Sequence, residues 1–308
     1  MGFFRFPNWI VVVVVFGMMN LFNLGFGGRK VASLYEAPAM AIRYHNGALL
    51  QGNVPVSILW YGKFTAPQKA IVLDFFLSLD EAHEVTPSVS RWWNALQVYM
   101  KRAGKKDAKV TLANQITDDK YSIGKFLKKP HISELSRRTG SKYGGVTLVL
   151  TAEDVAVEGF CMSSCGFHDW DHKSKSAFIW VGNSVSQCPG QCAWPFHQPI
   201  YGPQTPPLLP PNADVGIDGM IINIATLLAG TATNPCGNGY FLGSPTAPLE
   251  AATACPGVYG KGAYPGYAGE LLQDSTTGGS YNAAGVGTRK YLLPALYDPV
   301  TSRCSTLV

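Results

Sequence analysis

Short apolar runs alternate with helical patterns through the first half of the chain, and this alternation restricts the possible folds more than any other feature. The expected strands are Pro55–Gly62, Ala108–Gln115, Gly144–Asp154 and Ser176–Asn183. The expected helices are Thr65–Leu79, Ser88–Lys101 and pieces within Tyr121–Arg138. Strands that alternate with helices need crossover connections. The sequence therefore predicts an α/β fold with a mixed, mainly parallel sheet.

Size and charge exclude several classes of protein. The chain has 308 residues, of which 46% are hydrophobic and 15% are charged. This is ample for one large domain or two small ones, and the low share of charged residues excludes an intrinsically disordered chain. The formal net charge of +5 is mild. Nucleic acid is therefore not an expected partner.

The N-terminus has the order of a signal peptide. Arg5 precedes the apolar run Trp9–Phe22, and the small residues Gly25 and Gly27 follow at the positions −3 and −1 of a cleavage site. We expect residues 1–27 to be removed and residues 28–43 to form a short N-terminal segment. The alternative is a signal anchor, because the apolar run is somewhat long. From the sequence we expect no later apolar run to approach the ~20 residues of a membrane span, and therefore no membrane contact after cleavage.

The amino-acid composition of the chain changes after Asp154. Gly, Pro, Cys and aromatic residues crowd the stretches Gly159–His172 and Cys188–Asn212, and both are expected to be irregular loops. The Pro-rich part of the second stretch is either a packed loop or a flexible linker. Aromatic residues interleave its prolines, which favours a packed loop. Loops on a rigid scaffold are common places for functional sites.

Seven cysteines lie in this second half. They are Cys161, Cys165, Cys188, Cys192, Cys236, Cys255 and Cys304. Two C-x3-C pairs could be read as a four-thiolate zinc site, although their spacing is one residue longer than the common C-x2-C knuckle. Disulfides are favoured in a secreted chain, and an odd count leaves one thiol over.

The stretch Ile217–Pro235, "IDGMIINIATLLAGTATNP", is predicted to be a largely buried helix. Its apolar residues recur at steps of three and four, Asp214 or Asp218 can cap its first turn, and Asn234-Pro235 marks its end. The stretch resembles the central helix of secreted microbial zinc-dependent proteases of the zincin type, where the frame runs roughly "DAMI…HELAEAxTDP".

Longer motifs resemble the plant EXORDIUM-like proteins, the phosphate-induced protein family. They include "YHNGALLQGNVPVSILWYGKF", "VAVEGFCMSSCGFH", "IWVGNSVSQCPGQCAWPFHQPIYGPQ", "DVGIDGMIINIATLLAGTATNP" and "RKYLLPALYDPVTSRCSTLV". The resemblance covers a single domain, residues 44–308. It implies a secreted plant protein of the apoplast and cell wall, linked to brassinosteroid-dependent growth and cell expansion. It implies no established biochemical activity.

The zincin resemblance places its metal-site positions on residues that cannot bind zinc. In the protease frame one helical face carries a His and a second ligand four residues later, with a Glu beside the His as general base. Those places fall on Thr226, Gly230 and Leu227. Downstream, the protease pattern "ExxDxC" falls on Glu250, Thr253 and Cys255, so the acidic position is Thr. The resemblance implies a zincin-like scaffold without a metal or other cofactor; the alternative is a chance likeness on an ordinary core helix.

We expect the helix to cross beneath the loops "GFCMSSCGFH" and "WPFHQPIYG". The candidate cleft residues are His168, His197, Tyr240 and Glu250. A metal site of another kind could in principle use residues of "HDWDH" together with His197. We expect those residues to lie on surface loops. The sequence shows neither a G-x-S-x-G nucleophile elbow nor a phosphate-binding loop.

For the cysteines, we predict a disulfide between Cys255 and Cys304 and closure of each C-x3-C pair on itself, as Cys161–Cys165 and Cys188–Cys192. The alternative joins one C-x3-C pair to the other. The resemblance assigns Cys236 as the free thiol, because EXORDIUM-like proteins usually carry Phe at its position.

Binding features are also present. Aromatic side chains that could stack on sugar rings, unless they pack in the core, are Trp92, Trp93, Trp194, Tyr201, Tyr259, Tyr264 and Tyr267. The basic stretch Lys101–Lys109 could meet acidic pectin, but an ordinary solvated loop is the favoured interpretation.

The sequence as a whole predicts a secreted, non-enzymatic growth regulator. Its partner would be a cell-wall polymer or an extracellular protein. The alternative is a secreted hydrolase, either a protease with a non-standard metal site or a wall-modifying enzyme.

Overall fold

The computed structural model describes Gly2 and residues 41–81, 87–141, 144–162 and 164–308. Apart from Gly2, the predicted signal peptide lies outside the described residues, as does the following segment up to residue 40. Residues Met40–Val308 form one compact unit.

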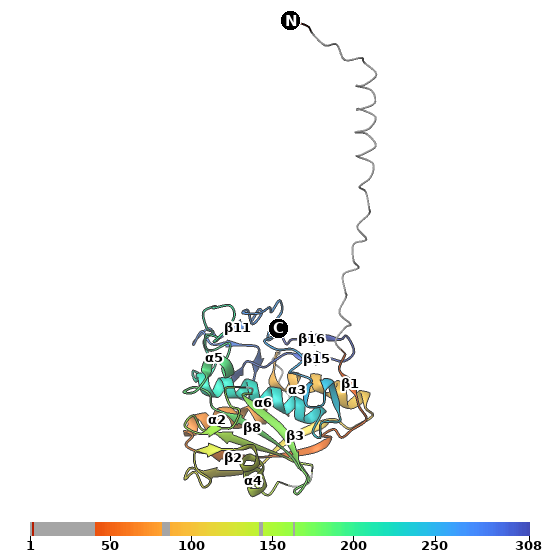
Figure 1. Cartoon of the computed structure of the whole chain (residues 1–308), viewed down its shortest axis with the longest axis vertical. Helices are drawn as coiled ribbons and strands as arrows, with labels where there is room; N and C mark the ends of the chain where they lie inside the picture. The colour runs from red at the N-terminus through yellow and green to blue at the C-terminus, as the bar shows by residue number, and fades with distance from the viewer. Residues whose placement is uncertain (1, 3–40, 82–86, 142–143, 163) are drawn as a thin grey trace. The chain divides into compact units, whose positions relative to one another are not determined.

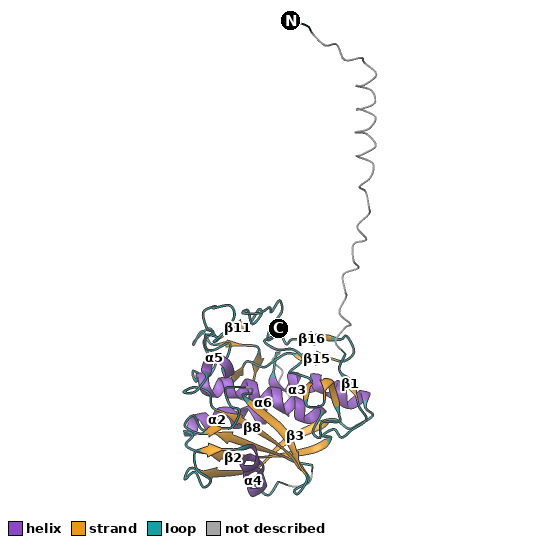
Figure 2. Cartoon of the chain, viewed as in Figure 1, coloured by secondary structure: helices purple, strands orange, loops and turns teal. Residues whose placement is uncertain are grey.

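Five strands form the central sheet, in the order β3-β2-β5-β8-β7 (Figure 2). Their bounds are β2 Gly52–Tyr61, β3 Ala108–Asp118, β5 Val146–Thr151, β7 Gly166–Asp171 and β8 Ser176–Gly182. The first four strands in this order run parallel, and β7 pairs antiparallel with β8 at the edge. The predicted mixed, mainly parallel sheet is confirmed, and the four predicted strands are all present.

The edge strand β7 was not predicted. The expectation of an irregular loop through Gly159–His172 is wrong for Gly166–Asp171, which hydrogen-bonds along β8. Side chains alternate along this strand as the pleat requires. Phe167 packs against Phe178 and Trp180 on one side of the sheet, whereas Trp170 packs into the core on the other side.

Five helices accompany the sheet in the described part of the chain. They are α2 Ala66–Ser78, α3 Val89–Arg102, α4 Lys129–Arg138, α5 Pro189–Cys192 and α6 Val215–Thr233. Thr65 begins α2 with the predicted capping box to Gln68, and the hydroxyl of Ser88 accepts from the N–H of Arg91 at the start of α3. The predicted helices Thr65–Leu79 and Ser88–Lys101 therefore agree with α2 and α3 to within one residue at each end.

The first part of the predicted helical stretch Tyr121–Arg138 is not helical. Tyr121 and Gly124 have φ of 56° and 91°, which an α-helix does not accept. The hydroxyl of Tyr61 donates to the carbonyl of Gly124 and so holds this turn against the sheet. A short strand β4, Phe126–Leu127, follows and pairs with β6, Ala156–Val157, before α4 begins.

The helices form layers on both faces of the sheet (Figure 1). Alternate residues of β2 show the division: Val56, Ile58 and Trp60 belong to the core shared with α2, α3 and α6, while Leu59 and Tyr61 belong to the core shared with α4. The larger core therefore lies between the sheet and α6.

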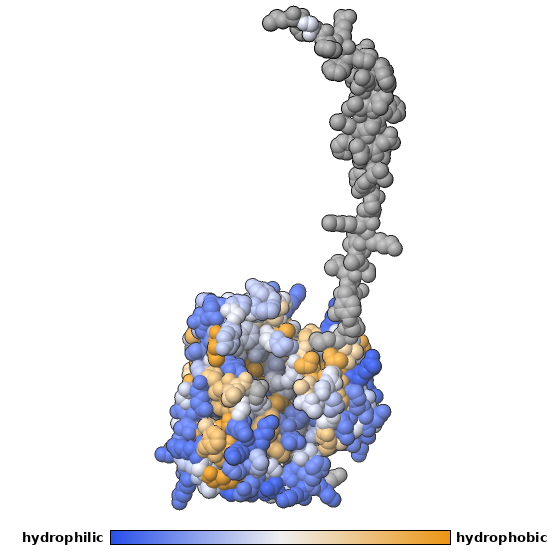
Figure 3. All heavy atoms as spheres, viewed as in Figure 1, coloured by the Kyte–Doolittle hydropathy of each residue, from blue (hydrophilic) through white to orange (hydrophobic). Residues whose placement is uncertain are grey.

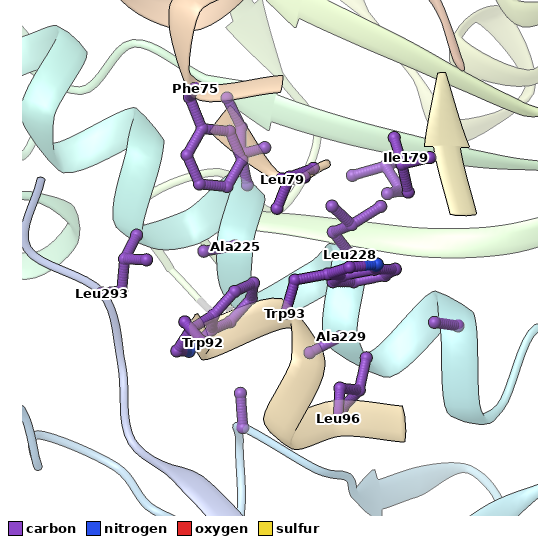
Figure 4. Packing of buried hydrophobic residues seen from close by; sticks show 14 of the residues in the cluster. Phe75, Leu79, Trp92, Trp93, Leu96, Ile179, Ala225, Leu228, Ala229 and Leu293 are labelled. Carbon is purple, nitrogen blue, oxygen red and sulfur yellow. The ribbon is translucent and has the colours of Figure 1, made fainter. Parts of the chain in front are cut away.

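The two tryptophans of α3 belong to this larger core. Trp92 and Trp93 pack with Ala225, Leu228 and Ala229 of α6 (Figure 4). Each indole N–H donates to a carbonyl, of Pro294 and Ala108 respectively, at 2.8 Å. Both side chains are thus structural and are not available to a ligand.

Helix α6 is central to the fold. Its length and composition would allow it to cross a membrane, which corrects the expectation that no apolar run after the leader approaches that length. However, 78% of its apolar window is buried inside the protein. It is the core helix of this unit.

Three disulfides tie the second half together. Cys161 pairs with Cys188 and Cys165 pairs with Cys192, so the prediction that each C-x3-C pair closes on itself is wrong. Residues four apart on a helical turn face the same way. Cys188 and Cys192 flank one turn at α5 and both face the other pair. The predicted Cys255–Cys304 bridge is present, and Cys236 is the free cysteine of the described residues.

The C-terminal part of the unit consists of loops and short antiparallel pairs. One group of three contains β1 Arg43–Tyr44, β9 Tyr240–Ser244 and β10 Ala247–Leu249. The others are β11 Leu272–Gln273 with β12 Ser280–Tyr281, β13 Ala283–Ala284 with β14 Lys290–Tyr291, and β15 Leu296–Asp298 with β16 Arg303–Ser305. Apolar residues appear on the visible surface as separate patches among hydrophilic ones (Figure 3).

The Pro-rich stretch is a packed loop, not a linker. Leu208 donates its backbone N–H to the carbonyl of Pro195, and the Thr205 hydroxyl donates to the carbonyl of Gly266. The first contact closes the loop on itself, and the second fixes it to the turn at Gly266.

Candidate functional site

The site forms where the C-terminal half of α6 passes the edge strand β7. The carboxylate of Asp214 accepts from the N–H of Ile217 and begins the helix, as predicted. Leu227 and Gly230 then face β7. The side chain of Leu227 lies so close to Gly166 that a Cβ there would be 2.8 Å from its Cδ1. The edge strand and α6 are therefore in close contact at these positions.

A histidine and a glutamate 82 positions apart meet at this point. Nε2 of His168 lies 2.9 Å from Oε2 and 3.1 Å from Oε1 of Glu250. The amide of Asn234, at the end of α6, donates to Oε1 at 2.7 Å. Glu250 is only 4% exposed. Two polar groups from separate elements thus satisfy a buried carboxylate, as burial requires.

These contacts suit one tautomer of His168. Carboxylate oxygens accept hydrogen bonds, so the tautomer with its proton on Nε2 is the one that can donate to Glu250. The other ring nitrogen, Nδ1, is buried and has no hydrogen-bond partner among the described residues. The pair can hold or move a proton at Nε2, which is acid–base chemistry of a general kind.

The His168–Glu250 pair leaves no room for a side chain at Gly230 of α6. A Cβ there would lie 2.2 Å from Oε2 of Glu250 and 3.2 Å from Nε2 of His168. Real Cβ atoms do not approach other atoms as closely as 2.2 Å. Glycine at 230 is therefore what allows Glu250 and His168 to pack against the helix.

The other positions of the zincin frame have local structural roles. The Thr226 hydroxyl donates to the carbonyl of Ile222 within the helix. The Thr253 hydroxyl accepts from the backbone N–H of Glu250 and so fixes the turn that presents its carboxylate. Of Thr226, Leu227 and Gly230, Leu227 alone is a lining residue of the pocket described next.

An open pocket of about 590 Å³ lies over the pair. Its walls come from β7, the end of α6 and the segment that links β9 to Thr253. The lining residues are Ser164, Gly166, Phe167, His168, Asp169, Leu227, Asn234, Pro235, Cys236, Gly237, Pro245, Thr246, Ala247, Pro248, Glu250 and Thr253. Its volume falls within the usual range of small-molecule sites.

The free thiol lies in the wall of this pocket. Burial raises the pKa of Cys236, and the negative charge of Asp169 raises it further. The thiolate is the reactive form of cysteine. A raised pKa therefore lowers the share of Cys236 that is thiolate at neutral pH.

The other charged residues of "HDWDH" do not join His168. The carboxylate of Asp171 is buried and forms an ion pair with Arg137 at 2.8 Å, while Asp169 and His172 are exposed. No group of three or more His, Cys, Asp or Glu in the described part of the chain could hold a metal ion. The potential donors that line the pocket are His168, Asp169, Cys236 and Glu250, of which His168 and Glu250 bond to each other.

Two candidate cleft residues lie elsewhere. Tyr240 is buried in the core, where its ring stacks on Tyr44 at 4.7 Å and meets the edge of Tyr99 at 4.9 Å. His197 is exposed and lines a separate cavity. Of the four expected cleft residues, His168 and Glu250 line the pocket, whereas Tyr240 and His197 lie outside it.

The predicted sugar-stacking residues also divide into two groups. Trp92, Trp93 and Tyr259 are buried. The other four, Trp194, Tyr201, Tyr264 and Tyr267, line two adjoining cavities of about 510 and 130 Å³. We call these cavities, with these four residues, the aromatic groove. The sequence alone could not show which of these aromatic side chains are buried and which line a cavity.

Known proteins resemble the chain over almost its whole length. Residues 42–307 match the family model described as the phosphate-induced protein 1 conserved region. The chain is 53% identical to Protein PHOSPHATE-INDUCED 1 of Nicotiana tabacum, with 96% of this chain and 98% of that relative covered. Identity to Protein EXORDIUM of Arabidopsis thaliana is 51%, with 97% and 100% covered. For Protein EXORDIUM-like 1 of Arabidopsis thaliana, identity is 54%, with 95% and 98% covered.

No solved structure shows a significant match to the chain. The family model and these relatives together confirm the resemblance seen in the sequence motifs. The chain belongs to the EXORDIUM-like, or phosphate-induced protein, family.

Proposed function

We propose that the protein is a secreted apoplastic regulator of brassinosteroid-dependent growth and cell expansion that acts by binding and not by catalysis. Residues 1–27 are its signal peptide, and residues 44–308 are one functional domain. The three disulfides support secretion, because such bridges persist in oxidising compartments. The partner is a cell-wall polymer or an extracellular protein.

The observation that carries the non-catalytic part of this proposal is the contact between Gly230 and Glu250. In the zincin frame position 230 carries a metal ligand, but here the carboxylate of Glu250 fills the space that such a side chain would need. Thr226 and Leu227 offer neither a zinc ligand nor a general base. We propose descent from a zincin-type scaffold whose metal site has been replaced by the His168–Glu250 pair.

A second candidate function is a hydrolase of another kind. The observation that favours it is the His168–Glu250 pair itself, since a hydrogen-bonded imidazole and carboxylate beside an open pocket can exchange protons with a bound substrate. This hydrolase would need the imidazole of His168. The two candidates therefore predict different results for one substitution.

His168→Gln separates them. The amide nitrogen of Gln can donate to Glu250 in place of Nε2, so the buried carboxylate keeps a partner while the imidazole is lost. The full chain is expressed with its leader in plant cells, and the secreted protein is recovered from the medium. Cell expansion is then measured with wild-type and variant protein at equal concentration.

We expect both proteins to begin near Gly28 and to produce the same cell expansion. Retention in membranes with residues 1–27 attached would contradict secretion. A folded His168→Gln variant that loses both the growth response and a cleavage activity of the wild type would favour the hydrolase. Thr226→Ala, on the same helix but outside the pocket, is the matched control.

A further inference from the structure

We propose that the aromatic groove binds a neutral polysaccharide chain, with sugar rings stacked on Tyr201 and Tyr264. This inference rests on the proposed binding function and names the class of its partner. The groove is separate from the His168–Glu250 pocket, because the two share no lining residue.

Three of the four aromatic side chains of the groove are exposed to solvent. Tyr201 is 88% exposed, Tyr264 is 64% exposed and Tyr267 is 38% exposed. Most large aromatic side chains of the described unit are buried instead. The rings of Tyr264 and Tyr267 lie 5.1 Å apart. Exposed aromatic faces of this kind suit a ligand that is apolar on one face and hydrated on the other.

The backbone beneath these rings is fixed before any ligand binds. Tyr264 and Tyr267 exchange two backbone hydrogen bonds, of 3.0 and 2.8 Å. The amide of Gln204 donates to the carbonyls of Pro199 and Gly202, which closes the turn that carries Tyr201. A preorganised site loses less entropy on binding than a flexible one.

Close packing joins the two sides of the groove. Gly266 has φ of 89°, and a Cβ there would lie 2.5 Å from Cβ of Pro203. The carbonyl of Gly266 also accepts from the hydroxyl of Thr205. The Pro-rich loop and the turn at Tyr264 are therefore in direct contact, so the backbone segments that carry Tyr201 and Tyr264 are held next to each other.

A small apolar cluster anchors the groove to the core helix. Phe196, Tyr259 and Ala268 pack with Ile222 of α6, and Trp194 packs on the same cluster. The rings of Trp194 and Tyr259 lie 5.7 Å apart. The Cys165–Cys192 bridge fixes the chain two residues before Trp194. The groove is thus built on rigid parts of the fold.

Charge decides which class of chain fits. The residues that line the two cavities include no Lys, Arg, Asp or Glu. An acidic polymer such as pectin would find no Lys or Arg there and only the imidazole of His197, and a cationic peptide would find no carboxylate. The Tyr hydroxyl groups and backbone carbonyls can hydrogen-bond to sugar hydroxyls, while the rings stack on sugar C–H faces. A neutral polysaccharide meets all of these requirements.

The volume and shape of the groove agree with a chain of more than one sugar. Its two cavities of about 510 and 130 Å³ share Trp194, Tyr264 and Gly266. Tyr264 therefore lies between two adjoining compartments. Its ring is in the position to stack on a central sugar of the bound segment.

The test is calorimetric titration of the secreted full-length protein with cellohexaose, a neutral β-1,4-linked glucose hexamer. We expect Tyr201→Ala and Tyr264→Ala each to raise Kd about tenfold, since each removes one stacked ring. Tyr264→Phe should raise Kd by no more than about fivefold, because it keeps the ring and removes one hydrogen-bonding hydroxyl.

Phe126→Ala is the matched control. Phe126 is 62% exposed and lies on β4, outside the groove. Its removal takes away an exposed aromatic ring of similar size, and Kd should not change. Since all the substituted side chains are exposed, the variants should fold as the wild type does.

Several results would overturn the inference. These are failure of the wild type to bind cellohexaose, equal binding by the Tyr→Ala variants, tighter and salt-dependent binding of polygalacturonate, or displacement of cellohexaose by a proline-rich peptide that itself binds more tightly. If the wild type fails to bind but still promotes cell expansion, this inference fails and the proposed function stands. Hydrolysis of bound cellohexaose would leave the polysaccharide assignment standing and would contradict the non-catalytic function.

Discussion

The carboxylate of Glu250 occupies the space that a side chain at Gly230 would need, because a Cβ at Gly230 would lie 2.2 Å from Oε2. The carboxylate is held there by Nε2 of His168 at 2.9 Å and by the amide of Asn234 at 2.7 Å. A substitution at any of these positions therefore affects the others.

Gly230→Ala should lower the free energy of unfolding by about 1–3 kcal/mol, although Ala is the better helix former. The added methyl group must displace the buried Glu250 carboxylate from its two partners. Chemical denaturation of the variant and the wild type measures the difference. Thr226→Ala on the same helix should cost less than about 1 kcal/mol, because its hydroxyl bonds only within the helix. A Gly230→Ala variant as stable as the wild type would contradict this account.

His168→Leu should destabilise the protein by about 1–3 kcal/mol, because it removes a hydrogen-bond donor from a carboxylate that is only 4% exposed. His168→Gln should recover most of that loss, since its amide can donate to Glu250. Thermal unfolding of both variants under the same conditions tests this. Equal unfolding temperatures for the Leu and Gln variants would show that the hydrogen bond to Glu250 does not matter.

Stability should depend on pH through Asp218 at the start of α6. Burial raises the pKa of Asp218 from its ordinary value of 3.8 to about 7, against the effect of two hydrogen bonds from Asn212. Between about pH 4 and pH 7 the folded protein then holds a proton that the unfolded chain has lost. The contribution of Asp218 to stability therefore rises as the pH falls through 7 and is complete below about pH 4, with a slope of at most about 1.4 kcal/mol per pH unit.

Asp218→Asn cannot ionise and should lose this part of the pH dependence. The free energy of unfolding, measured from pH 4 to pH 8 for both proteins, should show the variant gaining stability relative to the wild type as the pH rises. Parallel curves for the two proteins would contradict the assignment.

Non-reducing peptide mapping should find Cys161 joined to Cys188, Cys165 to Cys192 and Cys255 to Cys304. The Cys255–Cys304 bridge closes a loop of 49 residues. Cys304→Ser should therefore cost about 2–4 kcal/mol in the chain-entropy description. A bridge that contains Cys236 would contradict the scheme.

Local sequence signals located most of the scaffold. Thr65 and Ser88 are capping residues, and both begin helices where the sequence predicts them. Apolar runs likewise located the four parallel strands. The edge strand β7 escaped prediction because its sequence, GFHDWD, is polar and Gly-flanked, and its pairing with β8 is a tertiary contact. The available signal for a strand was that Phe167 and Trp170 stand at positions whose side chains point to opposite faces, with His168 on the same face as Trp170.

The site was less predictable because it depends on long-range packing. The zincin resemblance singled out Leu227, Gly230 and Glu250, but pairing His168 with Glu250 needs the position of β7 against α6. Tyr240, expected in the cleft, lies in the core, since a tyrosine in a Gly-rich segment can be either exposed or buried. Here Tyr44 and Tyr99 cover it. Cross-pairing of the C-x3-C motifs requires the loop that carries Cys161 and Cys165 to face the helical turn that carries Cys188 and Cys192. The spacing of the cysteines alone does not show this.

Zinc content, measured together with peptide cleavage, tests the central claim most directly. The secreted wild-type protein is purified without chelator, its zinc is quantified by mass spectrometry, and peptide cleavage is assayed with and without added zinc and chelator. Because Glu250 fills the space at Gly230 and, on the proposed descent from a zincin scaffold, Leu227 stands where the base would be, we predict far less than one zinc per chain and no zinc-dependent cleavage. One zinc per chain, with chelator-sensitive cleavage that disappears in His168→Gln, would contradict the account.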